Sequence, residues 1–468
     1  MPLLNKNIFR GFSIRGIWGK DFDSEGVQQF AQGLSNWFNQ HGIHKLVIGY
    51  DARVHSPTID QVLCDSLRDG GMDVIDLGLI PTPIWNFATD FYHAQGGVMI
   101  TASHNPPEYN GFKIRTDVTV YGDELQQIYE LSAQPFQASQ RGTYTREDPL
   151  PAYEAALRQR IGQIKPFHVV VDGANGANGQ HVPGILRRMG CTVHELYCEI
   201  DGNFPNRDPD PTAAHATDAL GEKVRETHAD LGLAFDGDGD RLIIVDENGQ
   251  AMMGDQILML LAANAIQKKQ TQKVAYEVLC SQVVADYITE CGGSAVSSPS
   301  GYAFVHEAML QSGAKLGGEM SGHFFLLDDT FRFDDSIVAT ATLLTLLGAQ
   351  TKSLNQLAAT LPHYFPSPTV EHRIACPDEL KGEIVRSMRD HYLAKGYPCD
   401  QTDGVKFDFG NVWGLIRQSN TQPVLSLKFE SKLSTEHMLT TQKEVGEQLV
   451  REFEQRGLDT AEIKKKLF

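Results

Sequence analysis

Cysteine is scarce in this chain, and its spacing shows no pairs. Seven cysteines are spread over 468 residues, and no two of them form a C-x-x-C motif. An odd, dispersed set argues against a disulfide framework and against a cysteine-ligated zinc site. We therefore expect most of these cysteines to be small buried apolar side chains in a reducing compartment.

The chain also lacks an excess of basic residues. Its 41 Lys and Arg are outnumbered by 59 Asp and Glu, which gives a formal net charge of −18. Nucleic-acid binding needs a basic face that displaces counterions, so this balance argues against a nucleic-acid partner. It is compatible with a small anionic substrate, because a local cluster of Arg and Lys can override the global field.

Long hydrophobic runs are missing as well. The most apolar internal stretches, 257–263 and 339–347, are too short to span a bilayer. The first residues lack the apolar segment of a signal peptide. With 41% hydrophobic and 21% charged residues, we expect a folded cytoplasmic protein without a membrane partner.

The order of apolar runs predicts an α/β protein with four domains. At 45–53, 168–176 and 273–281 a strand-like run is followed by a polar turn and a helix-like segment. This order is typical of three related α/β domains, which we expect to have mixed sheets with mostly parallel pairing. From about Pro366 the segments alternate like antiparallel strands, which predicts a C-terminal α+β domain. The domains are expected at residues 1–150, 151–254, 255–365 and 366–468.

Three aspartates alternate with glycines in the segment DGDGDR. Converging carboxylates repel one another, and the glycines allow backbone angles that point Asp236, Asp238 and Asp240 at one spot. An all-oxygen site favours a hard cation such as Mg²⁺ or Ca²⁺. A solvated acidic turn is the alternative. A calcium-binding helix–loop–helix is disfavoured, because strand-like runs flank the segment and Arg241 occupies the sixth loop position.

A serine follows the strand-like run GGVMI in the segment TASHNPP. Ser103, on a tight turn with His104 beside it, could act as a nucleophile, although the G-x-S-x-G pattern of a hydrolase elbow is absent. A helix N-cap or a turn held by its own side chains explains the same residues without chemistry. The segment by itself leaves both interpretations open.

Two further segments suit a sugar phosphate. Glu319, Ser321 and His323 in GEMSGH would share a short exposed loop between strands and could bind hydroxyl groups; a hydrogen-bonded turn or a metal site are the alternatives. The segment RQSNTQP begins at Arg417 and offers a guanidinium, hydroxyls and an amide, as phosphate recognition requires, with Lys428 on the next strand. A polar hairpin is the alternative there.

Together these segments resemble the α-D-phosphohexomutase superfamily. TASHNP, DGDGDR, GEMSGH and RxSNTxP occur in its order and spacing, and FRGFSIRG, NGFK and FRFDDSI extend the match over essentially the whole chain. The sequence is most similar to the bacterial phosphomannomutase/phosphoglucomutase branch. The resemblance implies four domains around a deep central cleft, each of which contributes one loop.

The resemblance also implies a role for each loop. Ser103 resembles a serine that is phosphorylated and whose phosphate also binds the metal ion. The implied Mg²⁺ ligands are Ser103, Asp236, Asp238 and Asp240. The implied catalytic residues are Ser103, His104, Lys113 and Arg241. The implied substrate-binding residues are Arg15, Glu319, Ser321, His323, Arg417, Ser419, Asn420, Thr421 and Lys428.

The implied reaction interconverts hexose 1-phosphate and hexose 6-phosphate, with mannose or glucose as the sugar. It requires Mg²⁺, a phosphoserine and a hexose 1,6-bisphosphate that turns over inside the cleft. Lys113 and His104 are candidates for the group that takes and returns the hydroxyl proton. Small sugar phosphates are the expected partners, and a monomer is the expectation from the family.

Four positions depart from the pattern of this branch. Phe12 replaces a usual Tyr, Gln256 a frequent Arg, Leu279 a common Lys and Tyr302 a usual His. Two basic side chains that help to hold substrate phosphate are thus replaced. The alternatives are a mutase of glucosamine phosphate or of an unusual sugar, and, from another class, a sugar-phosphate-binding protein with impaired catalysis. The SNT segment and Met320 argue against the glucosamine branch, and the intact serine and aspartates argue against a mere binder.

Overall fold

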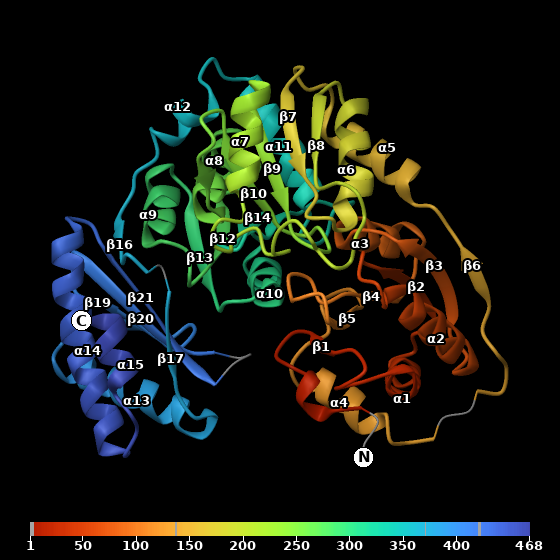
Figure 1. Cartoon of the computed structure of the whole chain (residues 1–468), viewed down its shortest axis with the longest axis horizontal. Coiled ribbons are helices and arrows are strands. Elements are labelled where there is room, and N and C mark those ends of the chain that lie inside the picture. Colours follow the sequence, from red (N-terminus) through yellow and green to blue (C-terminus); the bar gives the residue numbers. More distant parts are fainter. Residues whose placement is uncertain (1–3, 136–137, 370, 420–422) are drawn as a thin grey trace.

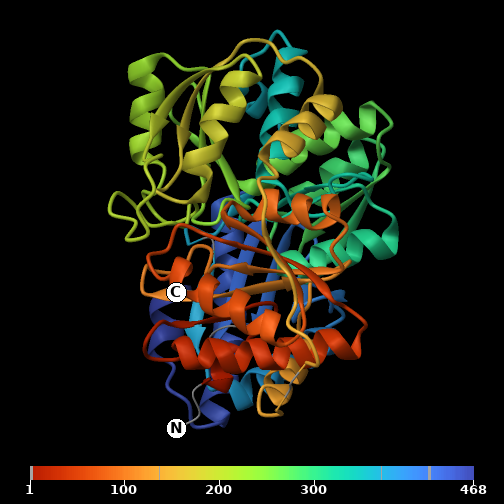
Figure 2. The same ribbon diagram turned by 90° about the vertical axis from the view of Figure 1, so that its right-hand side faces the viewer.

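The computed structural model of the chain describes residues 4–135, 138–369, 371–419 and 423–468. Four β-sheets follow one another along this part of the chain, and each defines one domain. Figure 1 shows the domains in an arc that begins with the red first domain and ends with the blue fourth. In Figure 2 the first domain faces the viewer and the fourth lies behind it. The bounds expected at 150, 254 and 365 stay predictions.

The first domain has a mixed sheet in the order β1-β5-β4-β2-β3-β6. Its strands are β1 (Ile14–Ile17), β2 (Lys45–Tyr50), β3 (Asp73–Leu79), β4 (Gly96–Ile100), β5 (Tyr109–Arg115) and β6 (Tyr144–Arg146). Its helices are η1 (Lys6–Ile8), α1 (Ser24–Gln40), α2 (Ser56–Asp69), α3 (Thr82–Phe91) and α4 (Asp123–Leu131). β2 is parallel to β3 and β4, whereas β5 is antiparallel to β4 and β1. The serine segment therefore forms the turn between β4 and β5.

The second domain has a sheet in the order β11-β10-β9-β7-β8. Its strands are β7 (His168–Asp172), β8 (Thr192–Leu196), β9 (Leu231–Phe235), β10 (Leu242–Asp246) and β11 (Ala251–Met252), and its helices are α5 (Leu150–Ile161), α6 (Ala177–Arg188) and α7 (Asp218–Thr227). β9 and β10 are antiparallel and pair Phe235 with Leu242. Every residue of both strands is buried, which explains their unbroken apolar sequences, and the three aspartates lie on the hairpin that joins them.

The third domain has a sheet in the order β13-β12-β14-β15. Its strands are β12 (Lys273–Glu277), β13 (Ser294–Ser298), β14 (Leu316–Gly318) and β15 (Phe324–Leu326), and its helices are α8 (Gly254–Gln267), α9 (Gln282–Glu290), α10 (Tyr302–Ser312), α11 (Ser336–Gly348) and α12 (Leu354–Ala358). β14 and β15 are antiparallel and flank the GEMSGH segment. The expectation that this loop is exposed was wrong, because Glu319 and His323 are both buried, each with 3% of its surface exposed.

The fourth domain is an antiparallel sheet in the order β16-β21-β20-β19-β18, with β17 also paired to β21. Its strands are β16 (Phe365–Pro366), β17 (His372–Ala375), β18 (Cys399–Asp400), β19 (Val405–Asp408), β20 (Val412–Gln418) and β21 (Val424–Ser431), and its helices are α13 (Asp378–Ala394), α14 (Thr435–Gln455) and α15 (Ala461–Leu467). The expected fold class, three mixed α/β domains followed by an α+β domain, is confirmed.

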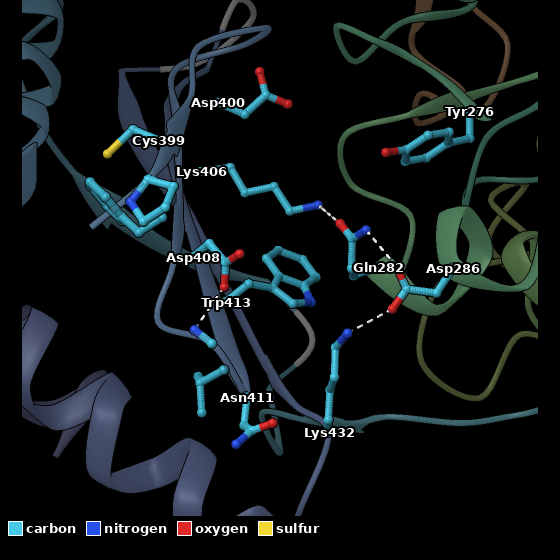
Figure 3. A pocket seen from close by; sticks show the side chains of 14 residues that line it. Tyr276, Gln282, Asp286, Cys399, Asp400, Lys406, Asp408, Asn411, Trp413 and Lys432 are labelled. Atoms are coloured by element: carbon cyan, nitrogen blue, oxygen red, sulfur yellow. Dashed lines mark hydrogen bonds and ion pairs between the residues drawn. The ribbon is translucent and has the colours of Figure 1, made fainter. Parts of the chain in front are cut away.

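The main hydrophobic core extends through three domains, whereas the fourth domain has a core of its own. One continuous core runs through the first three domains, from Val47 through Val169 to Ile257 and beyond. The fourth domain has its own core, built from residues between Ile374 and Leu467. The contact between the third and fourth domains contains a small apolar cluster of Val278, Trp413 and Leu415. It also contains a cavity of about 470 Å³, where Lys432 pairs with Asp286 at 2.8 Å (Figure 3).

Two expectations from composition can be compared with the structure. All seven cysteines are free thiols, and Cys291 and Cys399 are the two that are partly exposed. Among the residues described above, no helix is both long and apolar enough to cross a bilayer.

Candidate active site

Ser103 lies on the turn after β4 in a left-handed backbone conformation with φ of 50°. Such a conformation is uncommon for a residue with a side chain, and it is frequent at functional turns. The Ser103 hydroxyl donates a hydrogen bond to Asp236 at 2.9 Å, and it lies 3.2 Å from Nδ1 of His104. The turn between β4 and β5 thus meets the hairpin between β9 and β10 directly.

Arg53 holds this turn in place, and sequence reasoning missed it. Its guanidinium donates to the backbone carbonyls of four residues at 2.6–2.9 Å: Ser103, Asn105, Pro106 and Tyr109. It also pairs with buried Asp51 at 3.1 Å. The signal that could have revealed it is a charged Asp-x-Arg sequence directly after the buried strand β2, because buried charges occur where they are paired.

The three aspartates are completely buried and converge. One oxygen or more from each lies within 4.8 Å of the others. Asp236 accepts the amides of Gly239 and Arg241, at 3.0 and 3.1 Å. Asp238 accepts the hydroxyl of Thr82 at 2.7 Å and the ammonium of Lys113 at 2.6 Å. The hairpin therefore has a defined conformation and is not a solvated acidic turn.

Lys113, on β5, is the positive charge inside the cluster. It bridges Asp238 and Asp240, and these two carboxylates raise the pKa of its ammonium against the opposing effect of burial. Burial would raise the pKa of Asp238, but Lys113 outweighs it, so the pKa of Asp238 lies below its usual value. Burial and the two neighbouring aspartates raise the pKa of Asp236 well above its usual value.

The residues present fit a divalent cation. Oδ1 of Asp238 and Oδ1 of Asp240 are buried oxygens without a hydrogen-bond partner among the described residues. An unsatisfied buried carboxylate oxygen is costly, and coordination of a hard cation removes the cost. Asp240, His323 and Asp334 form a second close group, but the 2.7 Å hydrogen bond between His323 Nδ1 and Asp334 already accounts for it.

Arg241 connects the hairpin between β9 and β10 to Glu319 and His323, two of the candidate sugar-binding residues. Its Nε donates to Nε2 of His323 at 3.1 Å. Glu319 accepts the amide of Gly301 at 2.9 Å and the hydroxyl of Ser321 at 3.2 Å. The structure thus brings the second and third loops together around one guanidinium.

The phosphate-loop candidates are only partly described. Nε of Arg417 donates to Asp403 at 2.8 Å, and Lys381 donates to the carbonyl of Ser419 at 2.7 Å. Asn420 and Thr421 lie outside the described residues. Lys428 is buried beneath this region, where it donates to the carbonyl of Leu279 at 2.6 Å.

A cavity of about 540 Å³ joins these groups, and its lining comes from all four domains. Arg15 and His104 line it from the first domain, Arg241 from the second, Leu279 from the third and Arg417 from the fourth. Arg15 is held by the side chain of Asn105 at 2.6 Å. The described lining contains five arginines and one carboxylate, and it contains no lysine. This excess of positive charge suits an anionic ligand.

The four departures from the family pattern occupy different places. The rings of Phe12 and Tyr302 pack edge to face at 5.6 Å, and Tyr302 stacks on His323. Leu279 lines the cavity. Gln256 accepts the amide of Met253 and so caps α8. Neither Leu279 nor Gln256 brings a positive charge to the cavity.

Four family descriptions match consecutive parts of the chain. They are the alpha/beta/alpha domains I, II and III and the C-terminal domain of phosphoglucomutase/phosphomannomutase, at residues 6–137, 146–249, 253–365 and 371–448. A phosphomannomutase/phosphoglucomutase of Pseudomonas aeruginosa is 36% identical over 437 residues, 93% of this chain and 94% of its own length. The chain belongs to the phosphoglucomutase/phosphomannomutase family.

Other relatives agree with this family. A phosphoglucomutase of Neisseria gonorrhoeae is 33% identical over 436 residues, 92% of this chain and 94% of its own length. The crystal structure of a phosphoglucomutase/phosphomannomutase family protein from Burkholderia thailandensis superposes with a TM-score of 0.88 and 30% identity, over 96% of this chain and 97% of that one. The predicted family and the predicted class of enzyme, an intramolecular phosphotransferase, are confirmed.

Proposed function

We propose that the chain is a Mg²⁺-dependent phosphohexomutase that interconverts the 1- and 6-phosphates of glucose or mannose. Phosphorylated Ser103 and a hexose 1,6-bisphosphate serve as intermediates. The observation that carries the proposal is the meeting of the Ser103 hydroxyl with Asp236, at 2.9 Å, inside a buried carboxylate cluster. Arg241 and His104 then line an arginine-rich cavity next to it. The names of the relatives support glucose and mannose phosphates as substrates.

Asp236, Asp238 and Asp240 would hold the Mg²⁺, together with the phosphate on Ser103. When bound, the ion neutralises negative charge on the transferring group. Lys113 donates to Asp238 and Arg241 lies 3.9 Å from Asp236, and both would stabilise the equatorial oxygens of the same group. Arg417 and Ser419 would hold the phosphate that does not react.

The transfer step forms one bond and breaks one. O6 of a hexose 1-phosphate attacks phosphorus, the bond between phosphorus and Oγ of Ser103 breaks, and the proton of the O6 hydroxyl passes to a base. The leaving Oγ of Ser103 takes up a proton, so the product is the 1,6-bisphosphate and an unphosphorylated serine. In the second half Oγ of Ser103 attacks the phosphorus of the 1-phosphate and the bond between phosphorus and O1 breaks. The serine proton is lost to a base, O1 takes up a proton, and hexose 6-phosphate leaves.

His104 is the better of the two candidate bases. Burial and the nearby Arg241 and Arg15 lower its pKa well below the usual value, so the imidazole is neutral at rest, and the same shift makes it a weaker base. Its Nδ1 lies 3.2 Å from the Ser103 hydroxyl. Lys113 is held as a cation by Asp238 and Asp240, so it serves as a fixed positive charge.

A coupled assay tests the proposed function. Mannose, glucose and glucosamine 1-phosphates are supplied separately with Mg²⁺ and a trace of bisphosphate, and formation of each 6-phosphate is followed. We expect turnover of the glucose or mannose compound and little of the glucosamine compound. Turnover of glucosamine 1-phosphate alone would favour the glucosamine branch, and no turnover of any would leave a sugar-phosphate-binding protein.

Intact-mass analysis tests the phosphoserine separately from turnover. After incubation with glucose 1,6-bisphosphate, the wild type should gain one phosphate and Ser103→Ala none. Thermal denaturation with and without MgCl₂ tests the metal: Mg²⁺ should raise the melting temperature of the wild type, and Asp240→Asn should reduce that shift. A cytoplasmic location and a monomeric state stay predictions.

A further inference from the structure

Five arginines line the cavity: Arg10 and Arg15 from the first domain, Arg241 from the second, and Arg373 and Arg417 from the fourth. Arg15 and Arg241 lie at the end next to Ser103, where the reacting phosphate is proposed to bind. Arg373 and Arg417 lie at the other end, on the fourth domain. The sequence pattern assigns phosphate binding to Arg417 and gives no role to Arg373.

The sheet register places the two fourth-domain arginines on one face. Arg373 of β17 is directly opposite Ser426 of β21, and Arg417 of β20 is opposite the same serine on the other side. Directly opposed residues of antiparallel strands project to the same face of a sheet. The two arginines are therefore two strand spacings apart, roughly 10 Å between Cα atoms, with Ser426 between them.

Both guanidinium groups are oriented by carboxylates. Nε and Nη2 of Arg373 donate to Glu371 at 3.1 and 3.0 Å, and Nε of Arg417 donates to Asp403 at 2.8 Å. Glu371 also accepts the hydroxyl of Ser426, which connects it to the middle strand. When a carboxylate holds some of the N–H groups of a guanidinium, the orientation of the group is fixed and its remaining N–H groups are pre-organised to bind an oxyanion.

The third domain supplies no cation to this end in the described lining. Leu279 contributes an apolar side chain where the family commonly has a lysine. Lys428 is turned to the Leu279 carbonyl and to Met320, and it is not part of the lining. A dianionic phosphate at this end therefore meets Arg417 and Arg373, each already paired with one carboxylate, Asp403 and Glu371 respectively.

We propose that Arg373 is a second phosphate-binding arginine, which grips the non-reacting phosphate of the sugar phosphate together with Arg417. This inference rests on the proposed mutase function for the identity of its ligand. In this assignment Arg373 of β17 supplies a positive charge, whereas the third domain has Leu279 where the family commonly has a lysine. Because the phosphate alternates between C1 and C6 during turnover, the same pair would hold either end of the bisphosphate.

The test compares Arg373→Ala and Arg373→Lys with the wild type in the coupled assay. We expect Arg373→Ala to raise KM about 10- to 100-fold, the effect of one charge-assisted hydrogen-bonding partner, with kcat changed less than about threefold. The KM of Arg373→Lys should lie between those of the wild type and Arg373→Ala, because an ammonium keeps the positive charge but lacks the planar pair of N–H donors. Arg389→Ala is the matched control, since Arg389 lies on α13 of the same domain and pairs with Asp390.

Calorimetric titration of glucose 1-phosphate into Ser103→Ala, with and without Arg373→Ala, gives a second measurement that needs no turnover. A weakened Kd in the double variant, with an unchanged melting temperature, supports the inference. A KM and a Kd both within twofold of the parent protein would overturn it. A wild type without mutase activity would instead overturn the proposed function, and titration with inorganic phosphate would still report whether Arg373 binds an oxyanion.

Discussion

Arg53 illustrates how one buried residue can organise the reactive loop. It satisfies four carbonyl groups of the serine turn and neutralises Asp51, which also accepts the hydroxyl of Thr101 at 2.7 Å. The strained backbone of Ser103 persists because these contacts determine it from several sides.

We expect Arg53→Met to reduce the free energy of unfolding by about 3–5 kcal/mol, because it leaves the buried Asp51 without its partner. Urea denaturation measures this change. Ser103→Ala is the control and should stay within about 1 kcal/mol of the wild type, since it removes only one hydroxyl. A loss in Arg53→Met as small as that in the control would contradict the assigned role.

A second residue-scale prediction concerns Glu277, at the end of β12. Its carboxylate accepts the amide of Met320 at 2.9 Å, and burial together with the nearby Glu319 raises its pKa to about 8 from an ordinary value of 4.5. The folded state therefore holds a proton that the unfolded state releases between these values. The stability from this proton is complete below pH 4.5 and is lost as the pH rises through about 8.

Glu277→Gln should flatten this part of the pH dependence, because the amide can still accept the Met320 hydrogen bond but cannot ionise. The measurement is the free energy of unfolding of both proteins at pH 6 and pH 9. We expect the wild type to lose more stability than the variant between the two values. Equal losses would show that Glu277 does not titrate in this range.

At the scale of elements, the site depends on two turns that touch through their backbones. A Cβ atom added to Gly237, on the β9–β10 hairpin, would lie 2.6 Å from the carbonyl oxygen of Ser103, on the β4–β5 turn. Neither atom can move aside without moving its turn. Glycine is thus required here by the approach of another element and not by its own backbone angles.

Gly237→Ala should separate the serine from the aspartates and lower kcat by roughly 100-fold, the loss expected for a displacement of about 1 Å between reacting groups. Gly348→Ala, on α11, is the control, because its nearest atoms leave ordinary space at 3.5 Å. Steady-state kinetics of both variants provide the comparison. Full activity in Gly237→Ala would mean that the two turns do not need to touch.

At the scale of the whole molecule, the separate core of the fourth domain suggests where motion occurs. Hydrogen bonds tie this domain to the third, among them Ser281 with Glu430 at 2.8 Å and Ser300 with Asp403 at 3.1 Å. One core runs through parts of the other three domains, and the first domain has a second core of its own. An interface held by hydrogen bonds and one small apolar cluster adapts to a hinge movement more readily than a continuous apolar core does.

We expect glucose 1,6-bisphosphate to draw the fourth domain toward the first by more than about 2 Å, since the ligand joins charges at both ends of the cavity. A pair of fluorescent labels on the first and fourth domains would report this as increased energy transfer. With the ligand bound, Ser103→Ala should show the same increase in energy transfer as the wild type, and Arg417→Ala should show a much smaller increase. Identical transfer with and without ligand would exclude such a closure.

Much of the site could be predicted from local sequence. Short sequence segments were enough to identify Ser103 and Asp236 as candidates. The informative segments are the glycines and aspartates of the hairpin, the polar turn after β4, and the apolar runs that flank both. The alternation of strands and helices likewise predicted four domains. These features depend on backbone propensity and on side-chain chemistry, which are local.

Tertiary structure decided which of these residues meet. Ser103 and Asp236 are 133 positions apart, and only the packing of two domains brings their oxygens to 2.9 Å. Packing within the first domain gave Arg53 its carbonyl partners, and long-range packing elsewhere buried Glu319 and His323 and directed Lys428 to the carbonyl of Leu279. Strand register placed Arg373 beside Arg417. Local sequence specifies a residue's chemistry, whereas its partners follow from long-range packing, which no single segment contains.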